Sequence, residues 1–298
     1  MRYRFKHVVE YGFLRGVSGL ANLLPYRAAL MLGWVFAWLS YHLSAKPRER
    51  VTRRLIQVFG DELSEHERRR TGWTAWRNLF FNYVEALRTP SISLEWVKKV
   101  VDCDAVNVVL EHLKSGRGLI VAIPHVGNWE LAGVAVPLFG VDVATIARRQ
   151  KNPLTDAYLM RMRELTGLKV FYTESKAFSG FVRRLKEGKV VGILPDLRAK
   201  ARAVTVKFLG VETQVAAGMG LFAHEAGVPI MVGISIRDRW DHHKWMVLDP
   251  VRPDPSADRD ADIQRMTQEV MDQVADVVRK HPEQYFWFNK RWVLGEER

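Results

Sequence analysis

The segment His125-Val-Gly-Asn-Trp-Glu130 places a histidine and a glutamate at the spacing His-x4-Glu. An imidazole held by a carboxylate is a general base, which removes a proton from a hydroxyl as the hydroxyl oxygen attacks a carbonyl carbon. Of the nine histidines in the chain, only His125 has an acidic residue five positions later. Because about one such match is expected by chance, the alternative of a histidine near an ordinary first-turn glutamate stays open. The strand and helix on either side of the pair therefore decide how strongly the pattern indicates a catalytic site.

Those neighbours predict how the pair is positioned. Residues 118–124 are a short apolar run, typical of a buried parallel strand, and His125 follows it directly. Ligands gather at the carboxyl ends of such strands. Five residues of continuous helix turn by about 140°, so His125 and Glu130 converge only if Gly127 forms a turn and Asn128 caps a new helix. We therefore expect Glu130 in the first helical turn, orienting the imidazole.

Beyond about residue 105 the chain alternates short apolar runs with helical segments. We predict strands at 118–124, 143–147, 169–172, 190–194, 229–236 and 245–248, and helices at 128–138, from 152, at 177–186, 214–225 and 261–280. This alternation implies an α/β fold with a largely parallel central sheet flanked by helices. Residues 47–88 have a helical pattern, in which Ser64 and Glu67 form a capping box.

The N-terminal region has the composition of a membrane-facing helix. The formal net charge is +12, and basic residues cluster just after an uncharged apolar stretch at 28–45. As a helix this stretch is about 27 Å long, slightly short of a bilayer core. Trp34, Trp38 and Tyr41 share one face of it, as an interfacial helix prefers. We predict a helical membrane-associated extension at 1–46, peripheral or single-pass, and an α/β domain at 47–298; a core helix at 28–45 is the alternative.

The sequence lacks the residue patterns of several other kinds of functional site. The single cysteine, Cys103, rules out an intramolecular disulfide and suits a reducing compartment, and no secretory signal pattern is present. There is no Gly-x-Ser-x-Gly elbow or phosphate-binding loop, and His224-Glu225 lacks the second histidine of a zinc helix. Gly218-x-Gly220 follows no predicted strand, which indicates close helix packing rather than a dinucleotide site. We expect no metal and no cofactor, and an active domain facing the cytoplasm.

With these residues in hand, the chain resembles the bacterial lipid A biosynthesis lauroyl/myristoyl acyltransferases, within the lysophospholipid acyltransferase-like superfamily. Beyond the His-x4-Glu block, matching segments occur in order over nearly the whole length: 148–156 (Arg-Arg-Gln-Lys-Asn-Pro-Leu-Thr-Asp), Arg163, 194–196 (Leu-Pro-Asp), 208–210, 218–230 and 282–292. The last of these, Pro-Glu-Gln-Tyr-Phe-Trp-Phe-Asn-Lys-Arg-Trp, is the most specific. The resemblance implies a glycerolipid acyltransferase-like fold at the cytoplasmic face of the bacterial inner membrane.

The resemblance also implies the reaction and the roles of the residues. It implies transfer of a fatty acyl chain from an acyl carrier protein or coenzyme A thioester to a hydroxyl of a glycolipid such as a lipid A precursor, with His125 as the base and Glu130 as its partner. Arginines in such a site suit substrate phosphates, because a guanidinium binds phosphate bidentately. Trp287 and Arg291 are expected to anchor the C-terminal segment. The candidates for substrate contact are Asn128, Arg148, Arg149, Asn152, Arg163 and Asp196.

Alternatives remain within and outside this family. After Asp196 the chain continues Leu-Arg-Ala-Lys-Ala-Arg, whereas lipid A enzymes commonly carry a further Gln or His and an Asp there, so a phosphatidylinositol mannoside or another glycolipid or aminolipid acceptor stays open. A non-catalytic basic protein that binds membranes or nucleic acid would explain the charge, but no RRM, KH or zinc-finger pattern occurs, and we expect no nucleic acid partner. A third possibility is a thioesterase that uses water as the acceptor.

Overall fold

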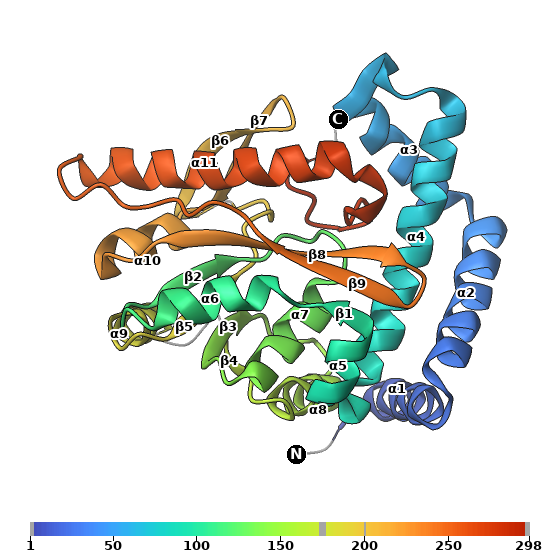
Figure 1. The fold of residues 1–298 in the computed structure, drawn as a ribbon. Coiled ribbons are helices and arrows are strands. Elements are labelled where there is room, and N and C mark those ends of the chain that lie inside the picture. Colours follow the sequence, from blue (N-terminus) through green and yellow to red (C-terminus); the bar gives the residue numbers. More distant parts are fainter. Residues whose placement is uncertain (1–2, 173–176, 200, 296–298) are drawn as a thin grey trace.

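A seven-stranded sheet forms the centre of the protein in a computed structural model that describes residues 3–172, 177–199 and 201–295 (Figure 1). Its order is β1-β9-β8-β2-β5-β3-β4. All neighbouring strands run parallel except the antiparallel pair β8 and β9, so the predicted α/β fold with a largely parallel sheet is confirmed. The strands are β1 Val101–Asp102, β2 Leu119–Ala122, β3 Val143–Ala147, β4 Lys169–Tyr172, β5 Val190–Ile193, β8 Ile230–Arg239 and β9 His242–Val247.

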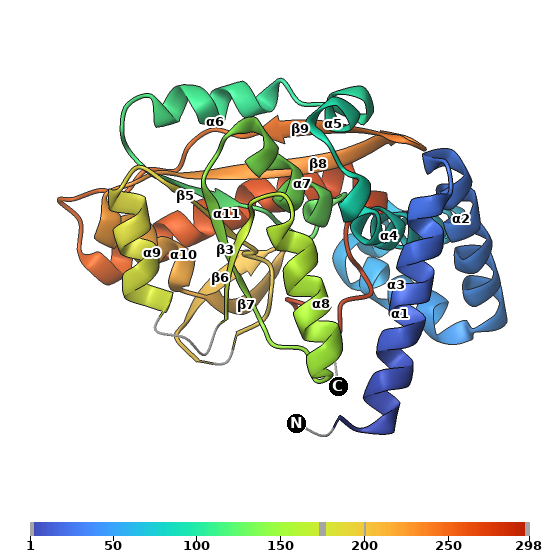
Figure 2. The ribbon, with the colours of Figure 1, turned by 90° about the horizontal axis from the view of Figure 1, so that it is seen from below.

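Helices cover both faces of this sheet (Figures 1 and 2). One face carries α9 (Ala177–Lys186), α10 (Gly218–Ala226) and α11 (Arg259–Lys280), and the other carries α6 (Ala105–Leu113), α7 (Trp129–Ala135) and α8 (Pro153–Glu164). The short helix α5 (Leu94–Val100) leads into β1. Because both faces are covered, most residues of the central strands are buried, as their apolar sequences predict.

Four N-terminal helices pack against one end of this α/β unit. They are α1 (Phe5–Leu23), α2 (Tyr26–Leu43), α3 (Ala45–Phe59) and α4 (Glu65–Leu87). α2 lies along α4, and α1 bridges α4 and α8, as Figure 2 shows. The predicted capping box of Ser64 and Glu67 is present. The predicted helical character of residues 47–88 is confirmed, with a break at Gly60, which has a φ of +50° and separates α3 from α4.

No single described helix is long and apolar enough to cross a membrane. α2 and the following helical segment up to Glu62 meet the requirement together, but across a bend of 85°. The predicted boundary after residue 46 falls close to this bend. Contact of the N-terminal segment with a membrane stays a prediction.

A hairpin replaces part of one predicted helix. Residues 214–216 belong to β7 (Val211–Ala216), which pairs with β6 (Ala203–Phe208), and α10 begins only at Gly218. Buried and exposed side chains alternate along β7 and along the second half of β6, which packs on α11, and the helical prediction overlooked this pattern. Close packing at Gly220 is confirmed, since a Cβ there would lie 2.9 Å from the Ile263 carbonyl oxygen. Short 3-10 segments occupy Gly60–Glu62, Thr89–Ser91, Val136–Phe139 and Pro282–Gln284.

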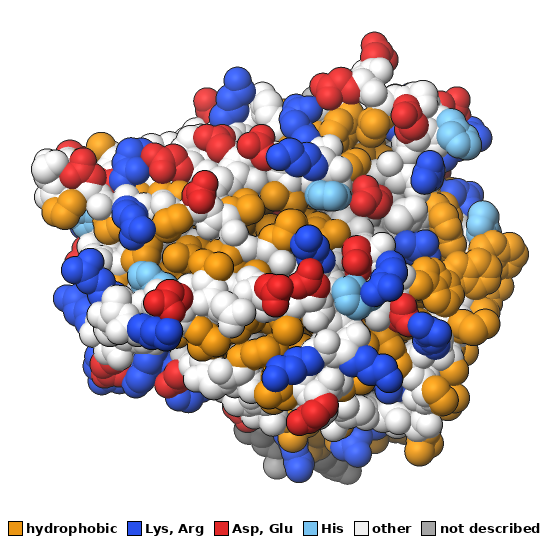
Figure 3. All heavy atoms as spheres, viewed as in Figure 1, with side chains coloured by type: hydrophobic (Ala, Val, Ile, Leu, Met, Phe, Trp, Pro, Cys, Tyr) orange, Lys and Arg blue, Asp and Glu red, His pale blue; other side chains and the backbone are white. Residues whose placement is uncertain are grey.

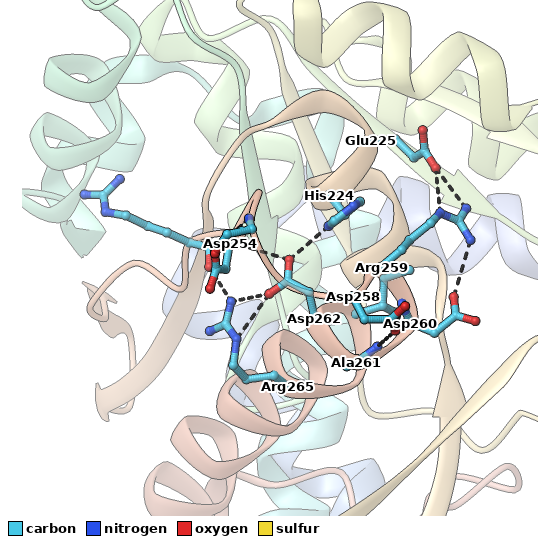
Figure 4. Close-up of polar contacts among 12 residues, drawn as sticks. His224, Glu225, Asp254, Asp258, Arg259, Asp260, Ala261, Asp262 and Arg265 are labelled. Carbon is cyan, nitrogen blue, oxygen red and sulfur yellow. Dashed lines mark hydrogen bonds and ion pairs between the residues drawn. The ribbon is translucent and has the colours of Figure 1, made fainter.

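A polar cluster fastens α10 to the start of α11 (Figure 4). His224 Nδ1 lies 2.9 Å from Asp262 Oδ2, and the same buried carboxylate accepts hydrogen bonds from Arg265 and from the backbone N–H of Asp254. Asp258 caps α11 by accepting from two amides of its first turn. His224 therefore serves helix packing here. Burial opposes ionisation of Asp262, but its hydrogen bonds outweigh burial and hold its pKa below the usual value.

Candidate active site

The loop that carries His125 is held in one conformation from two sides. β2 ends at Ala122, and the loop turns at Gly127, which has a φ of +60°. A Cβ at Gly127 would lie 1.7 Å from the Ser235 carbonyl oxygen, so only glycine fits. The N–H of Gly127 donates to Gln284 O at 2.8 Å, and the N–H of Asn128 donates to Ser235 O at 2.9 Å. The turn predicted from Gly127 is confirmed.

A buried polar network supports this loop from α4. Glu85 accepts hydrogen bonds from Asn128 Nδ2 at 2.5 Å and from Arg237 Nη1 at 3.1 Å. Asn82 Nδ2 donates to the carbonyl oxygen of Gly127 at 2.6 Å. Burial opposes ionisation of Glu85, but the charge of Arg237 outweighs it and holds the pKa of Glu85 below its usual value. Since removing one member of a buried charged pair costs about 3–5 kcal/mol, this network is a strong constraint on the loop.

The imidazole of His125 is oriented by Asp196. Nδ1 of His125 lies 2.9 Å from Asp196 Oδ1, and the backbone N–H of His125 donates to Asp196 Oδ2 at 3.0 Å. The ring of Trp129 meets the imidazole edge-on, at 4.9 Å between centroids. Because Nδ1 is engaged, the other ring nitrogen, Nε2, is the one left for a substrate proton.

The predicted pairing of His125 with Glu130 is wrong. Glu130 does lie in the first turn of α7, but its carboxylate pairs with Arg163 of α8, at 2.7 Å from Nη2 and 3.3 Å from Nε. The negative charge of Glu130 raises the pKa of the Arg163 guanidinium. The side chains of Glu130 and Arg163 are 33% and 26% exposed, so this ion pair is partly open to solvent. Glu130 and His125 thus share a pocket without sharing a hydrogen bond.

A polar pocket opens at the carboxyl ends of β2, β3 and β5. Its volume is ≈ 210 Å³, and its polar lining includes His125, Glu130, Arg148 and Arg163. Arg148 is exposed and makes no hydrogen bond or ion pair with any other described residue. The loop after it is fixed by Asp156, which accepts from the N–H of Gln150 at 2.8 Å. Of the predicted arginines, Arg148 and Arg163 therefore lie in the pocket.

Three predicted substrate contacts lie elsewhere. Asn128 is fully buried and caps α7 through the N–H of Leu131. Asn152 caps α8, and its Nδ2 donates to His7 O and Glu10 Oε2 of α1 at 3.0 Å each. The guanidinium of Arg149 lies over the ring of Tyr172, 3.8 Å from its centroid, outside the pocket lining. The two asparagines thus cap and position helices, and substrate contact by them stays a prediction.

An apolar slot adjoins the polar pocket. It lies between the sheet and helices α6 and α7, and glycines and apolar side chains alone line it among the described residues. Val106 and Val109 of α6 and Trp245 of β9 lie along it. Four residues line both spaces, namely Ile123, Gly133, Val143 and Gly192. The polar pocket that holds His125 therefore adjoins an apolar space of ≈ 60 Å³, which is enough for a short stretch of hydrocarbon chain.

Sequence reasoning missed the residues that support this site. Tyr285, from the C-terminal signature, lies against Asp196; burial and the Asp196 carboxylate raise the pKa of its hydroxyl well above the usual value. Its place in that signature was the available signal. Glu85 and Arg237 had none, because they lie far apart in the chain and meet only through the fold. Trp287 is fully buried, which confirms its predicted anchoring role.

The carboxylate, histidine and cysteine side chains of the described ranges form no cluster of three or more that could hold a metal ion.

Comparison with known proteins places this site in a family. Residues 2–293 match the family described as bacterial lipid A biosynthesis acyltransferase. The phosphatidylinositol mannoside acyltransferase of Mycolicibacterium smegmatis is 25% identical over 222 residues, covering 72% of this chain and 70% of the relative. That of Mycobacterium tuberculosis H37Rv is 26% identical over 225 residues, covering 72% and 68%. Since the family match spans nearly the whole chain, this protein belongs to the bacterial lipid A biosynthesis acyltransferase family and is a glycolipid acyltransferase.

Proposed function

We propose that this protein transfers a fatty acyl chain from an acyl thioester to a hydroxyl of a phosphorylated glycolipid, with His125 as the general base. The observation that carries the proposal is the position of His125. Its imidazole is oriented by Asp196 and lines a polar pocket with two arginines, and this pocket adjoins an apolar slot. An ester-forming enzyme needs this combination, because its substrates are a polar alcohol and a hydrocarbon chain.

In the proposed reaction, His125 Nε2 accepts the proton of the acceptor hydroxyl as its oxygen attacks the thioester carbonyl. The buried carboxylate of Asp196 accepts from Nδ1–H and stabilises the imidazolium that forms. When the tetrahedral intermediate collapses, the carbon–sulfur bond breaks and the imidazolium returns its proton to the departing thiolate. The products are an ester and a free thiol, and no covalent enzyme intermediate is required. Such base assistance is worth about 10²–10⁴-fold in rate.

We propose that Arg148 binds the negatively charged groups of the substrates. The backbone N–H groups of residues 125–128 all donate within the protein, so they are not free to bind an oxyanion or phosphate. Arg163 is committed to Glu130, whereas Arg148 lines the pocket without a partner among the described residues. A guanidinium binds phosphate bidentately, so Arg148 suits the acceptor phosphate or the phosphate groups of the donor.

We assign the acyl chain to the apolar slot. Burying each methylene of a chain there contributes about 0.8 kcal/mol, which suffices to select among chain lengths. The donor, an acyl carrier protein or coenzyme A thioester, would present the carbonyl at the junction residues Gly133 and Gly192. The basic surface of the chain suits either anionic donor.

For the acceptor, we propose a phosphatidylinositol mannoside at the cytoplasmic membrane face in preference to a lipid A precursor. The support is that the relatives reported above carry the name phosphatidylinositol mannoside acyltransferase. The residues after Asp196 agree, because they depart from the pattern common in lipid A enzymes.

The test offers both acceptors side by side to the purified full chain, with acyl carrier protein and coenzyme A donors, and analyses the lipids by mass spectrometry. We expect the mannoside to gain one acyl mass, matched by free thiol. Acylation of the lipid A precursor alone would overturn the acceptor proposal. Thiol and free fatty acid, without an acylated lipid, would instead make the protein a thioesterase.

A further inference from the structure

A second pocket lies in the bend between α2 and α3, which meet at 85°, and α4 closes it. We call it the elbow pocket; its volume is ≈ 990 Å³. None of its described lining residues lines the catalytic pocket. The elbow pocket is lined by Trp34, Trp38, Tyr41, His42, Arg48, Glu49, Thr52, Arg53, Arg69 and Trp73.

Aromatic rings form one wall of this pocket. His42 lies between Trp38, at 4.8 Å between ring centroids, and Trp73, at 6.0 Å. Tyr41 meets Trp73 at 5.3 Å. Trp34, Trp38 and Tyr41 do share one face of α2, as their spacing predicted, and that face lines the pocket. Indole and phenol rings with one polar end are typical of the boundary between lipid chains and water.

Arginines line the same pocket. Three guanidinium groups and one carboxylate, that of Glu49, line the pocket, so its net charge is positive. Arg48 is held in place by donating to the carbonyl oxygens of Tyr41 and His42, at 2.5 Å and 3.1 Å. Arg53 is exposed and has no ion pair among the described residues. Among the described residues Arg69 pairs only with Glu65, and because both side chains are highly exposed, this pair is weak. The pocket thus offers guanidinium groups to a phosphate.

Beside the pocket, α2 exposes apolar side chains to solvent. Leu43, at the bend, is 83% exposed, and Trp38 is 45% exposed. Figure 3 shows the resulting hydrophobic surface over α2, at the right-hand edge of the molecule. A helix on a protein surface in water normally turns such a face inward. The other exposed apolar residues of α2 are Met31, Val35, Phe36 and Leu39.

We propose that the elbow pocket binds the phosphate headgroup of an anionic membrane phospholipid, with the exposed apolar face of α2 inserted beside it among the lipid chains. A phosphate pocket next to an apolar helix matches the order of groups in a phospholipid. It does not match a nucleic acid, whose phosphates require a charged track along the surface. This site is separate from catalysis, and its occupation is measured without any acyl donor, so it stands or falls independently of the proposed reaction.

The test measures partition of the full chain onto vesicles of phosphatidylcholine with one quarter phosphatidylglycerol, by flotation. Arg53→Gln with Arg69→Gln is compared with Arg117→Gln with Arg183→Gln. The second pair is a matched control: Arg117, like Arg53, is exposed without an ion pair to a described residue, and Arg183 has an exposed i,i+4 pair with Glu187, as Arg69 has with Glu65. Both variants lose the same net charge.

We expect the vesicle partition coefficient of the Arg53→Gln, Arg69→Gln variant to fall about 25-fold, because each arginine near an anionic surface contributes about fivefold. The partition coefficient of the control variant should fall less than about threefold. Trp38→Ala should weaken partition independently of charge. Equal losses in the two double variants would overturn the proposal, since net charge would then explain binding. It would also fail if wild type bound soluble glycerol phosphate, or DNA, but not the vesicles. Melting temperatures of all variants confirm that they are folded.

Discussion

At the scale of single residues, the reaction depends on which carboxylate holds His125. Asp196 is buried and touches both Nδ1 and the backbone N–H of His125, whereas Glu130 is partly exposed and paired with Arg163. A buried carboxylate fixes the tautomer and stabilises the imidazolium in a low dielectric, where its charge is felt most strongly. A solvent-facing ion pair contributes much less. The two carboxylates should therefore differ sharply in their effect on the rate.

We predict that Asp196→Asn lowers kcat for acyl transfer by about 10³–10⁴-fold, because an asparagine amide favours the wrong imidazole tautomer. Glu130→Gln, with the same change in charge and shape, should lower kcat by less than about tenfold and act mainly on the acceptor KM through Arg163. Steady-state kinetics of the two purified variants measure this difference. The reverse order would restore Glu130 as the partner of His125.

The local structure around His125 could be predicted from the sequence, but its pairing with Asp196 could not. The strand before His125, the turn at Gly127 and the cap at Asn128 follow local rules, and all three were predicted correctly. The partner of His125 could not be predicted in this way. Asp196 lies 71 positions away, and it reaches His125 only because β5 lies next to β2 in the sheet. Strand order is a property of the folded chain rather than of any local pattern.

At the scale of elements, α6 and α7 set the shape of the apolar slot. Val109 faces the slot and is buried, whereas Val108, the next residue of α6, is 48% exposed on the other side of the helix. Gly133, in α7, leaves the junction with the polar pocket open, since a Cβ there would meet only Leu168 at 3.9 Å. The slot is thus bounded by side chains whose size can be changed without touching the reactive groups.

Val109→Phe should shift the preferred donor toward shorter acyl chains. Each methylene that no longer fits costs about 0.8 kcal/mol, or roughly fourfold in kcat/KM. Overpacking should also destabilise the fold by about 1–3 kcal/mol. Mass spectrometry of products from a mixture of donor chain lengths gives the preference, with Val108→Phe as the matched control. An unchanged preference in Val109→Phe would place the acyl chain elsewhere.

Elements with clear local sequence patterns were predicted with the correct bounds, and those without them were not. Strands β3 and β4 and helix α9 match the predicted ranges residue for residue, because apolar runs and helical periodicity bound them. The hairpin of β6 and β7 was missed, since the pattern of residues 214–216 fits either state until the partner strand is known. The capping box at Ser64 marked the start of α4, and Gly60, directly after α3, fits the break before it.

At the scale of the whole molecule, buried carboxylates join distant parts of the chain. Glu85 connects α4 to β8 and to the catalytic loop, and Asp262 connects α11 to α10 and to the loop before it. Both have pKa values below their usual range in the folded state. A depressed carboxyl pKa adds stability that is fully present above the unfolded-state pKa and is lost as the pH falls through the folded-state value. The fold should therefore weaken in acid.

We predict that Asp262→Asn destabilises the protein by about 3 kcal/mol at pH 7, where the wild-type carboxylate is ionised in both states and its buried contacts are intact. The difference from wild type should begin to shrink as the pH falls below about 4, where the carboxyl of the unfolded chain takes up a proton, and it should be small once the pH is below the lowered folded-state pKa of Asp262. Urea unfolding at several pH values measures both quantities. Asp276→Asn, at an exposed position of the same helix, is the control and should have little effect. A difference independent of pH would show that the charge of Asp262 is not involved.

The central claim is that His125 is the base of a glycolipid acyl transfer, and its most direct test is the rate of ester formation by purified His125→Ala. The acylated lipid and the released thiol are measured together, with wild type in parallel. We predict that the variant remains folded, by its melting temperature, and loses at least about 100-fold in kcat. Retention of more than about a tenth of the wild-type rate would contradict the role assigned to His125.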